Sequence, residues 1–207
     1  MKTAIIGLGN MGKGLAKRLA GKTELTVASR DVAAAAAFAS GLSNVKSASV
    51  SDAVASADIV ILALPYAAAL ETAALPSLKG KIVVDISNPV KPDFSGLSIG
   101  HITSAAEEIQ SVAKGAHVVK AFNTIFAGLF ETSSASTTSV PVFLAGNDEA
   151  SVNAVADLVA KAGFAVEKTG GLDAAKLLEP LGMLNIRLGY GLGRGTAIAP
   201  NWLVVSG

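Results

Sequence analysis

The fold is decided near the amino terminus by the stretch Thr3-Ala4-Ile5-Ile6-Gly7-Leu8-Gly9-Asn10-Met11-Gly12. Its first four residues form a mostly apolar run, which predicts a buried β-strand. The next six carry glycine at the spacing Gly-x-Gly-x-x-Gly, and a helix with Met11, Leu15 and Leu19 on one face follows. A strand, a glycine turn and an amphipathic helix in this order are typical of a dinucleotide-binding unit.

Outside this unit, short runs rich in valine and isoleucine alternate with alanine-rich helical segments. The expected strands are residues 3–6, 24–28, 59–64, 82–86, 117–121, 142–145 and 164–168. In the first helix we expect Lys13, Lys17 and Arg18 to face water, and Gly21 to end the helix. The βαβ order predicts a Rossmann-like α/β fold with a doubly wound, mostly parallel sheet.

The pattern changes toward the carboxyl terminus. A helix carrying Pro180, which we expect to kink or restart there, is followed by a glycine-rich run at residues 189–195. We expect residues 172–207 to form a short helical and glycine-rich cap on a nucleotide-binding domain of residues 1–171, in one compact unit. The second glycine run follows a helix and not a strand, so it lacks the geometry of a pyrophosphate turn.

Composition argues against several classes of partner. The chain has 17 lysines and arginines against 16 acidic residues, a formal net charge of +1, which gives no general attraction to nucleic acid or anionic lipid. It has no cysteine and two histidines, His101 and His117, too few ligands for a metal site. The uncharged, mostly apolar run at residues 59–70 is shorter than the roughly 20 residues that cross a bilayer. We expect a cytoplasmic protein with no nucleic-acid, metal or membrane partner.

The glycine turn has the residues that a pyrophosphate requires. Gly7 permits the tight turn, Gly9 lets the backbone approach the phosphates, and Gly12 lets the helix lie close to the strand. The amides of Asn10 and Met11 then point at the phosphates from the positive end of the helix dipole. The alternative interpretation is a glycine turn without a ligand.

The end of the second expected strand indicates which dinucleotide binds. An NAD site usually has a carboxylate there for the ribose 2′-hydroxyl, whereas a 2′-phosphate needs hydrogen-bond donors and a positive charge. This chain has Ser29 and Arg30 at that point, which favours NADP(H). In the alternative, Arg30 is a solvated surface residue and Asp31 binds the ribose.

Two later strands end in residues that we expect to line the same cleft, because ligands of open parallel sheets lie off the carboxyl ends of the strands. One of them ends in Ala63, Leu64 and Pro65, and the next ends in the segment Ser87-Asn88-Pro89. The prolines also suit simple turns, which is compatible with a place in the cleft wall.

Several fragments together resemble known families. They are Gly7–Gly12, Ser29-Arg30 and residues 57–60, 84–88, 115–124 and 145–148. The set resembles the reductases that use the deazaflavin coenzyme F420 to reduce NADP, and more closely the NADPH-binding domain of the six-transmembrane metalloreductases. The resemblance covers most of the chain. It implies an oxidoreductase that transfers hydride between NADP(H) and a flavin-type or deazaflavin small-molecule acceptor, with ferric or flavin reductase activity among the forms of this chemistry.

Two departures from the deazaflavin enzymes bear on the acceptor and the cofactor. Where those enzymes have histidine in the segment matching residues 121–125, this chain has Asn123, as the metalloreductase domain does. The basic residue that they place shortly after the Ser-Arg pair is also missing, because residues 33–37 are all alanine. Recognition of the 2′-phosphate then depends more heavily on Arg30.

Hydride transfer between a nicotinamide and a flavin-type ring needs no protein acid, base or nucleophile; it needs the two rings held together with water excluded. We expect residues 121–125, from Ala121 onward, to line the floor under the nicotinamide and the acceptor. Asn123 is a candidate for orienting the nicotinamide carboxamide or the acceptor carbonyl. In the alternative interpretation it caps the next turn.

Four further hypotheses remain open on the sequence. The glycine turn also resembles that of β-hydroxyacid dehydrogenases, whose lysine acid/base matches only Lys176 here, a residue we expect to be solvated. A non-catalytic NADP sensor is the second. Tyr190 and Arg194 are candidates for closing over the acceptor, and the apolar run Trp202-Leu203-Val204-Val205 predicts a homodimer.

Overall fold

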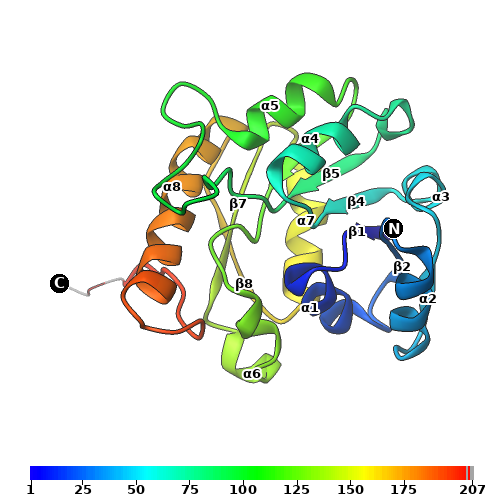
Figure 1. Cartoon of the computed structure of the whole chain (residues 1–207), viewed down its shortest axis with the longest axis horizontal. Helices are drawn as coiled ribbons and strands as arrows, with labels where there is room; N and C mark the ends of the chain where they lie inside the picture. The colour runs from blue at the N-terminus through cyan, green and yellow to red at the C-terminus, as the bar shows by residue number, and fades with distance from the viewer. Residues whose placement is uncertain (204, 206–207) are drawn as a thin grey trace.

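The computed structural model describes residues 1–203 and 205, and its centre is an eight-stranded sheet with helices on both faces (Figure 1). The strand order across the sheet is β3-β2-β1-β4-β5-β6-β7-β8. The strands are β1 (Lys2–Ile6), β2 (Glu24–Ala28), β3 (Val45–Ser47), β4 (Ile59–Leu62), β5 (Ile82–Asp85), β6 (His117–Lys120), β7 (Pro141–Gly146) and β8 (Ala165–Lys168).

Only β6 and β7 pair antiparallel; the other neighbours pair parallel. The first six strands therefore follow the order 3-2-1-4-5-6 of a Rossmann sheet. The expected Rossmann-like, mostly parallel α/β fold is confirmed.

The helices are α1 (Asn10–Leu19), α2 (Val32–Ser40), α3 (Val50–Ser56), α4 (Tyr66–Ala73), α5 (Ala105–Val112), α6 (Ser134–Thr137), α7 (Glu149–Lys161) and α8 (Ala175–Ile186). Alternate residues of the strands pack on opposite faces of the sheet. Ile5 contributes to the core with α1, α2 and α7, and Ala4 contributes to the core with α3, α4 and α5. Because both faces are covered, the strands consist mainly of apolar residues.

All seven expected strands form, within one or two residues at most of their ends. The strand expected over residues 59–64 ends at Leu62, two residues earlier. The expectation missed β3, whose three residues contain a single apolar one, Val45, and so show no strand pattern. The helix carrying Pro180 does not restart there: α8 continues through it and is followed by a π-helical turn, Arg187–Gly191.

The expectation that Arg18 faces water is wrong, because its side chain is only 6% exposed. Its guanidinium donates to the carbonyl oxygens of Phe130 (2.9 Å), Leu129 (2.8 Å) and Thr132 (2.7 Å), and to that of Ala162 at the end of α7 (3.2 Å). Burial lowers the pKa of this guanidinium from its usual value. Arg18 joins α1 to two distant segments, and its five N–H donors find acceptors without water.

The described helices include none with the length and apolar character that a membrane crossing requires. In Figure 1, α8 (orange) and α2 (blue) lie at opposite ends of the long axis of the molecule. Trp202, Leu203 and Val205 remain exposed, with Trp202 in edge contact with the ring of Phe143. Val204, also part of the run expected to bury itself in a dimer, lies outside the described residues.

Candidate functional site

The segments predicted to line a site converge at the carboxyl edge of the sheet. Strand register aligns the last residues of five neighbouring strands in one row, which are Ala28, Ile6, Leu62, Asp85 and Lys120. The residues that follow them begin the loops of the predicted site, so segments from distant parts of the chain leave the sheet along one edge. Ligands of open parallel sheets bind at this edge.

The glycine turn is constrained at two positions and open at the third. Gly7 has a φ of 102°, and a Cβ there would lie 2.3 Å from the carbonyl oxygen of Ala63. A Cβ on Gly12 would lie 1.9 Å from the carbonyl oxygen of Gly7, whereas a Cβ on Gly9 would meet nothing within 4 Å. No side chain caps the first turn of α1, so its leading amides point at the open space beside Gly9. The turn fits a pyrophosphate group.

Of the residues that follow β2, Ser29 and Asp31 make hydrogen bonds within the chain, and Arg30 makes none with the described residues. The Asp31 carboxylate accepts a hydrogen bond from the amide of Ala34 (2.9 Å) and caps α2, and the Ser29 hydroxyl donates to the carbonyl of Asp31 (2.6 Å). Arg30 is exposed and makes no hydrogen bond or ion pair with the described part of the chain. Its guanidinium is available to an anionic ligand, whereas one oxygen of Asp31 is already engaged.

The predicted wall residues differ in exposure. Ala63 and Leu64 are half-buried, Pro65 is exposed and begins α4 as its N-cap, and Ala121 is fully buried. Ala121 therefore lies beneath the site, and the part of the expected floor that lines a hollow begins at Phe122.

Asn88 and Asn123 form a reciprocal amide pair across β5 and β6. The Asn88 side-chain N–H donates to the backbone carbonyl of Asn123 (2.7 Å), and the Asn123 side-chain N–H donates to Asn88 Oδ1 (3.0 Å). The same Asn123 amide also donates to the carbonyl of Leu178 on α8 (2.9 Å). The side chain thus joins three segments, and these bonds do not form a cap for the next turn.

Three buried polar atoms at or near this pair have no hydrogen-bond partner among the described residues: Asn123 Oδ1, Thr124 Oγ1 and Ser87 Oγ. A buried polar atom without a partner costs about 1–3 kcal/mol, and such groups are rare in folded proteins. Their concentration at the ends of β5 and β6 indicates that a ligand with hydrogen-bonding groups completes this part of the site.

A hollow of about 260 Å³ opens here, which we call the carboxyl-edge hollow. It is lined by Asn10, Met11, Ile86, Asn88, residues 122–127, Gly182, Asn185, Ile186 and Tyr190. One wall is therefore the glycine turn, and the opposite wall is α8 and the turn after it. Asn185 donates to the carbonyl of Thr124 (3.0 Å), and the ring of Tyr190 packs edge-on against Phe126 at 5.3 Å between centroids.

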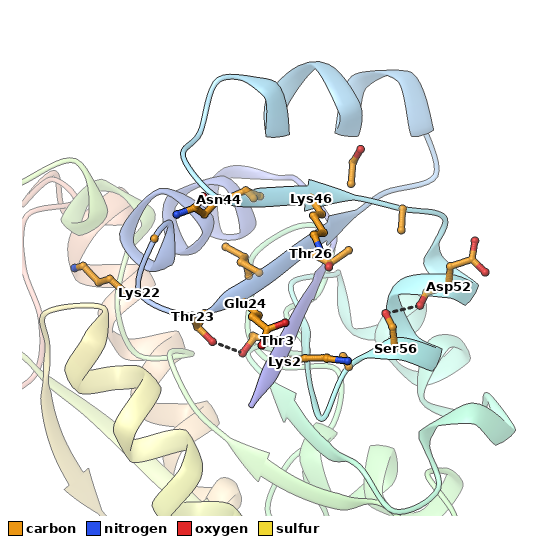
Figure 2. A pocket seen from close by; sticks show the side chains of 16 residues that line it. Lys2, Thr3, Lys22, Thr23, Glu24, Thr26, Asn44, Lys46, Asp52 and Ser56 are labelled. Atoms are coloured by element: carbon orange, nitrogen blue, oxygen red, sulfur yellow. Dashed lines mark hydrogen bonds between the residues drawn. The ribbon is translucent and has the colours of Figure 1, made fainter.

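A larger hollow of about 830 Å³ lies at the other edge of the sheet, at the amino ends of β1, β2 and β3 (Figure 2). We call it the amino-edge hollow. Its labelled side chains include Lys2, Thr26 and Lys46 from the strands and Asp52 from α3, mixed in charge and mostly exposed. Size alone does not identify the site, because ligands of parallel sheets bind at the carboxyl edge.

Comparisons with known proteins identify the family to which this chain belongs. Residues 2–89 match the family model described as NADP oxidoreductase, coenzyme F420-dependent. An F420-dependent NADP reductase from Methanocaldococcus jannaschii is 32% identical, over 91% of this chain and 92% of that protein. The chain belongs to this family. It is an NADP-dependent oxidoreductase, as expected from the sequence.

Two further relatives sharpen the placement within the family. The crystal structure of a putative F420-dependent NADP reductase from Arthrobacter sp. FB24 superposes with a TM-score of 0.81 at 32% identity, over 95% of this chain and 96% of the other. Metalloreductase STEAP3 of Rattus norvegicus is 29% identical over 87% of this chain and 36% of its own length. The sequence fragments had suggested a closer resemblance to the metalloreductases, and this ranking is wrong.

Lys176 does not lie in the carboxyl-edge hollow. Its ammonium group pairs with Glu107 on α5 (3.2 Å), and the side chain is 29% exposed, so it is less solvated than expected. Asn185, which comes later on the same helix, does line the hollow. His101 and His117 are both exposed, and the described residues contain no group of three or more potential ligands for a metal ion.

One hydroxyl near the edge has a shifted acidity. Burial, followed by a hydrogen bond to Glu108, raises the pKa of Tyr66 well above its usual value. The Tyr66 hydroxyl donates to the Glu108 carboxylate and joins the start of α4 to α5. Since this hydroxyl stays protonated through the neutral range, it acts as a structural donor.

A buried charge network that was not predicted from the sequence lies beside the hollow. Lys120, Asp85 and Glu179 meet with ion-pair distances of 2.7 and 2.8 Å and essentially no exposure. A signal for it was present, because Asp85 and Lys120 each end an otherwise apolar strand run. Their pairing depended on the register of β5 on β6, and Glu179 comes from a helix 59 positions after Lys120.

Proposed function

We propose that this chain transfers hydride between NADP(H), bound across the carboxyl edge of β1 to β6, and a small-molecule acceptor of the deazaflavin or flavin class. The observation that carries the proposal is the lining of the carboxyl-edge hollow: Tyr190 is its only ionisable side chain among the described residues. Hydride transfer between two rings requires no acid, base or nucleophile, so such a lining suits this chemistry.

The nucleotide half of the proposal rests on the glycine turn and the end of β2. The amides of Gly9, Asn10 and Met11 would hold the pyrophosphate, since α1 begins there without a side-chain cap. Ser29 and Arg30 would hold the 2′-phosphate, which supports NADP(H) over NAD(H). The cap formed by Asp31 supports the same choice, because it engages the carboxylate that an NAD site would direct to the ribose.

In the nicotinamide half, Asn123 Oδ1 and Thr124 Oγ1 are the groups that still need partners. A nicotinamide carboxamide supplies N–H donors and one acceptor, which would satisfy them without moving the Asn88–Asn123 pair. Ala63, Leu64 and Pro65 would form the wall on the adenosine side. The chain's own contribution is thus to bind, orient and exclude water, and the reduced nicotinamide supplies the hydride.

The acceptor proposal starts from the relatives, whose names specify coenzyme F420. Asn123 stands where the resemblance places a histidine in those enzymes, so we include ordinary flavins in the acceptor class. Residues 172–207 would act as the cap that completes the acceptor site on a nucleotide-binding domain of residues 1–171. The contacts of Asn123 with Leu178 and of Asn185 with Thr124 support this role.

The test is to follow NADPH oxidation by its absorbance against F420, FMN, FAD, quinones and ferric chelates, with NADH in parallel. We expect turnover with NADPH and F420 or a flavin, and much less with NADH. Tight NADPH binding without oxidation by any acceptor would favour the sensor hypothesis instead. Loss of activity in Lys176→Ala with every acceptor, at unchanged NADPH affinity, would return the assignment to a β-hydroxyacid dehydrogenase.

A further inference from the structure

Lys120 is a fully buried cation whose three N–H donors are all used. Its Nζ donates to Asp85 Oδ2 (2.7 Å), to Glu179 Oε1 (2.8 Å) and to the backbone carbonyl of Ser87 (2.6 Å). None of the three charged side chains lines the carboxyl-edge hollow. The network therefore has no direct contact with a ligand there, and its effect on the site must pass through the residues that it holds.

The two carboxylates have partners of their own. Asp85 Oδ1 accepts from the amide of Ser87 (2.9 Å). Glu179 accepts from the amides of Ala105 (3.0 Å) and Ala106 (3.2 Å) in the first turn of α5, where the helix dipole favours a negative charge. The network is therefore fully paired, which a buried charge cluster needs in order to persist.

Ser87 is held from both sides by this network. Asp85 accepts from its N–H and Lys120 donates to its carbonyl, so the backbone of Ser87 is fixed in one orientation. The next residue is Asn88, and its side chain makes the reciprocal pair with Asn123. The direction in which Asn88 leaves β5 is thus set by the charge network.

The same network also reaches the pair from α8. Glu179 is the neighbour of Leu178, whose carbonyl accepts from Asn123. One turn later, a Cβ on Gly182 would lie 2.8 Å from both the Asn123 carbonyl and Asn88 Oδ1, so α8 packs directly on the amide pair. A shift of α8 at Glu179 would therefore displace the pair as well.

We propose that Lys120, Asp85 and Glu179 are positioning residues, which set the place of the Asn88–Asn123 pair and through it the orientation of the nicotinamide ring toward the acceptor. This inference rests on the proposed function, which puts the nicotinamide in the carboxyl-edge hollow. Hydride transfer is sensitive to such placement, because a misplacement of about 1 Å can cost about 100-fold in rate.

The decisive variant is Glu179→Gln. Glutamine keeps the shape of the side chain, but its amide nitrogen would face an N–H donor of α5 or the Lys120 ammonium. We expect kcat to fall at least about tenfold while the KM and Kd for NADPH stay within about threefold, since the nucleotide half is untouched.

The matched control is Glu107→Gln. It breaks the ion pair with Lys176, which also joins α5 to α8, but it does not reach Ser87. We expect its kcat to stay within about twofold of the wild type, as for a partly exposed ion pair. An equal loss of kcat in both variants would assign the effect to general helix docking and would overturn the proposal.

A second readout does not depend on turnover. The fluorescence of the reduced nicotinamide in bound NADPH should be enhanced in the wild type and in Glu107→Gln, and the enhancement should be reduced in Glu179→Gln at saturating NADPH. If wild-type protein does not bind NADPH, the proposed function fails. If it binds, and Glu179→Gln keeps both the wild-type emission and the wild-type kcat, only the positioning proposal fails.

A triple variant, Asp85→Asn with Lys120→Met and Glu179→Gln, separates positioning from stability. It removes the three charges together, so that no buried charge is left without a partner. We expect the triple variant to fold, with kcat and nicotinamide emission as low as in Glu179→Gln. The proposal would be overturned by a wild-type kcat in a folded triple variant, or by the failure of both Glu179→Gln and the triple variant to fold.

Discussion

The two ends of the proposed cleft are built in different ways. The nucleotide end is contiguous and open: the residues between Gly7 and Gly12 form a single turn, and Arg30 is exposed without a partner among the described residues. The nicotinamide end is composite, because Asn88, Asn123 and Asn185 come from two loops and a helix. Affinity for the cofactor should therefore depend on the first end, and the rate of hydride transfer on the second.

The largest effect should come from Gly12→Ala at the nucleotide end. Its Cβ would lie 1.9 Å from a backbone oxygen of Gly7, which can move away only by opening the turn. We expect the Kd for NADPH to rise by about 100-fold or more, equal to at least about 2.7 kcal/mol, measured by fluorescence titration.

Gly9→Ala is the control for this variant, because its Cβ meets nothing within 4 Å. Its free energy of unfolding should change by no more than about 1 kcal/mol, while NADPH still binds more weakly because the methyl group occupies the space for the pyrophosphate. Unchanged NADPH affinity in Gly9→Ala would place the cofactor elsewhere.

Arg30→Ala should have the next largest effect. Loss of a charge-assisted hydrogen bond to a 2′-phosphate costs about 1.5–3 kcal/mol, so the Kd for NADPH should rise about 10- to 100-fold while that for NADH stays the same. Lys46→Ala removes the same charge at the amino-edge hollow and should leave both affinities unchanged. A similar loss for NADH would mean that Arg30 does not read the 2′-phosphate.

Asn123→Ala tests the other end of the cleft. The change removes the donor to Asn88 Oδ1 and to the Leu178 carbonyl, so we expect about 1–3 kcal/mol lower stability and kcat reduced about tenfold. The Kd for NADPH should change by less than about threefold. Asn153→Ala, at an exposed position on α7, serves as the control. A rise in the Kd for NADPH without a loss of kcat in Asn123→Ala would contradict the assignment of affinity to one end of the cleft and rate to the other.

Tyr190→Ala should have the smallest effect. Tyr190 is 68% exposed and contributes an edge contact with Phe126 at the mouth of the hollow. Loss of one aromatic contact to an acceptor ring should raise the acceptor KM about threefold, with the Kd for NADPH unchanged. An acceptor KM equal to that of the wild type would remove Tyr190 from the acceptor site.

The same contrast explains which features the sequence predicted. The strands and the glycine turn depend on neighbouring residues, so their patterns are visible locally. Arg18 was misassigned because its charge suggested solvent, whereas the carbonyl oxygens that surround it come from residues more than 100 positions away. The strand β3 was missed because three residues give no pattern and its pairing with β2 stabilises it.

The sequence alone determined the Rossmann-like class, the family and the expected cofactor of this protein. These depend on short runs whose physical requirements are local: a strand, the glycines of a turn and the charge that follows the second strand. Only the tertiary structure decided that Asn88 meets Asn123, that α8 closes the hollow and that Lys120 is paired on every side. Those contacts depend on strand register and helix packing, which no single stretch of sequence encodes.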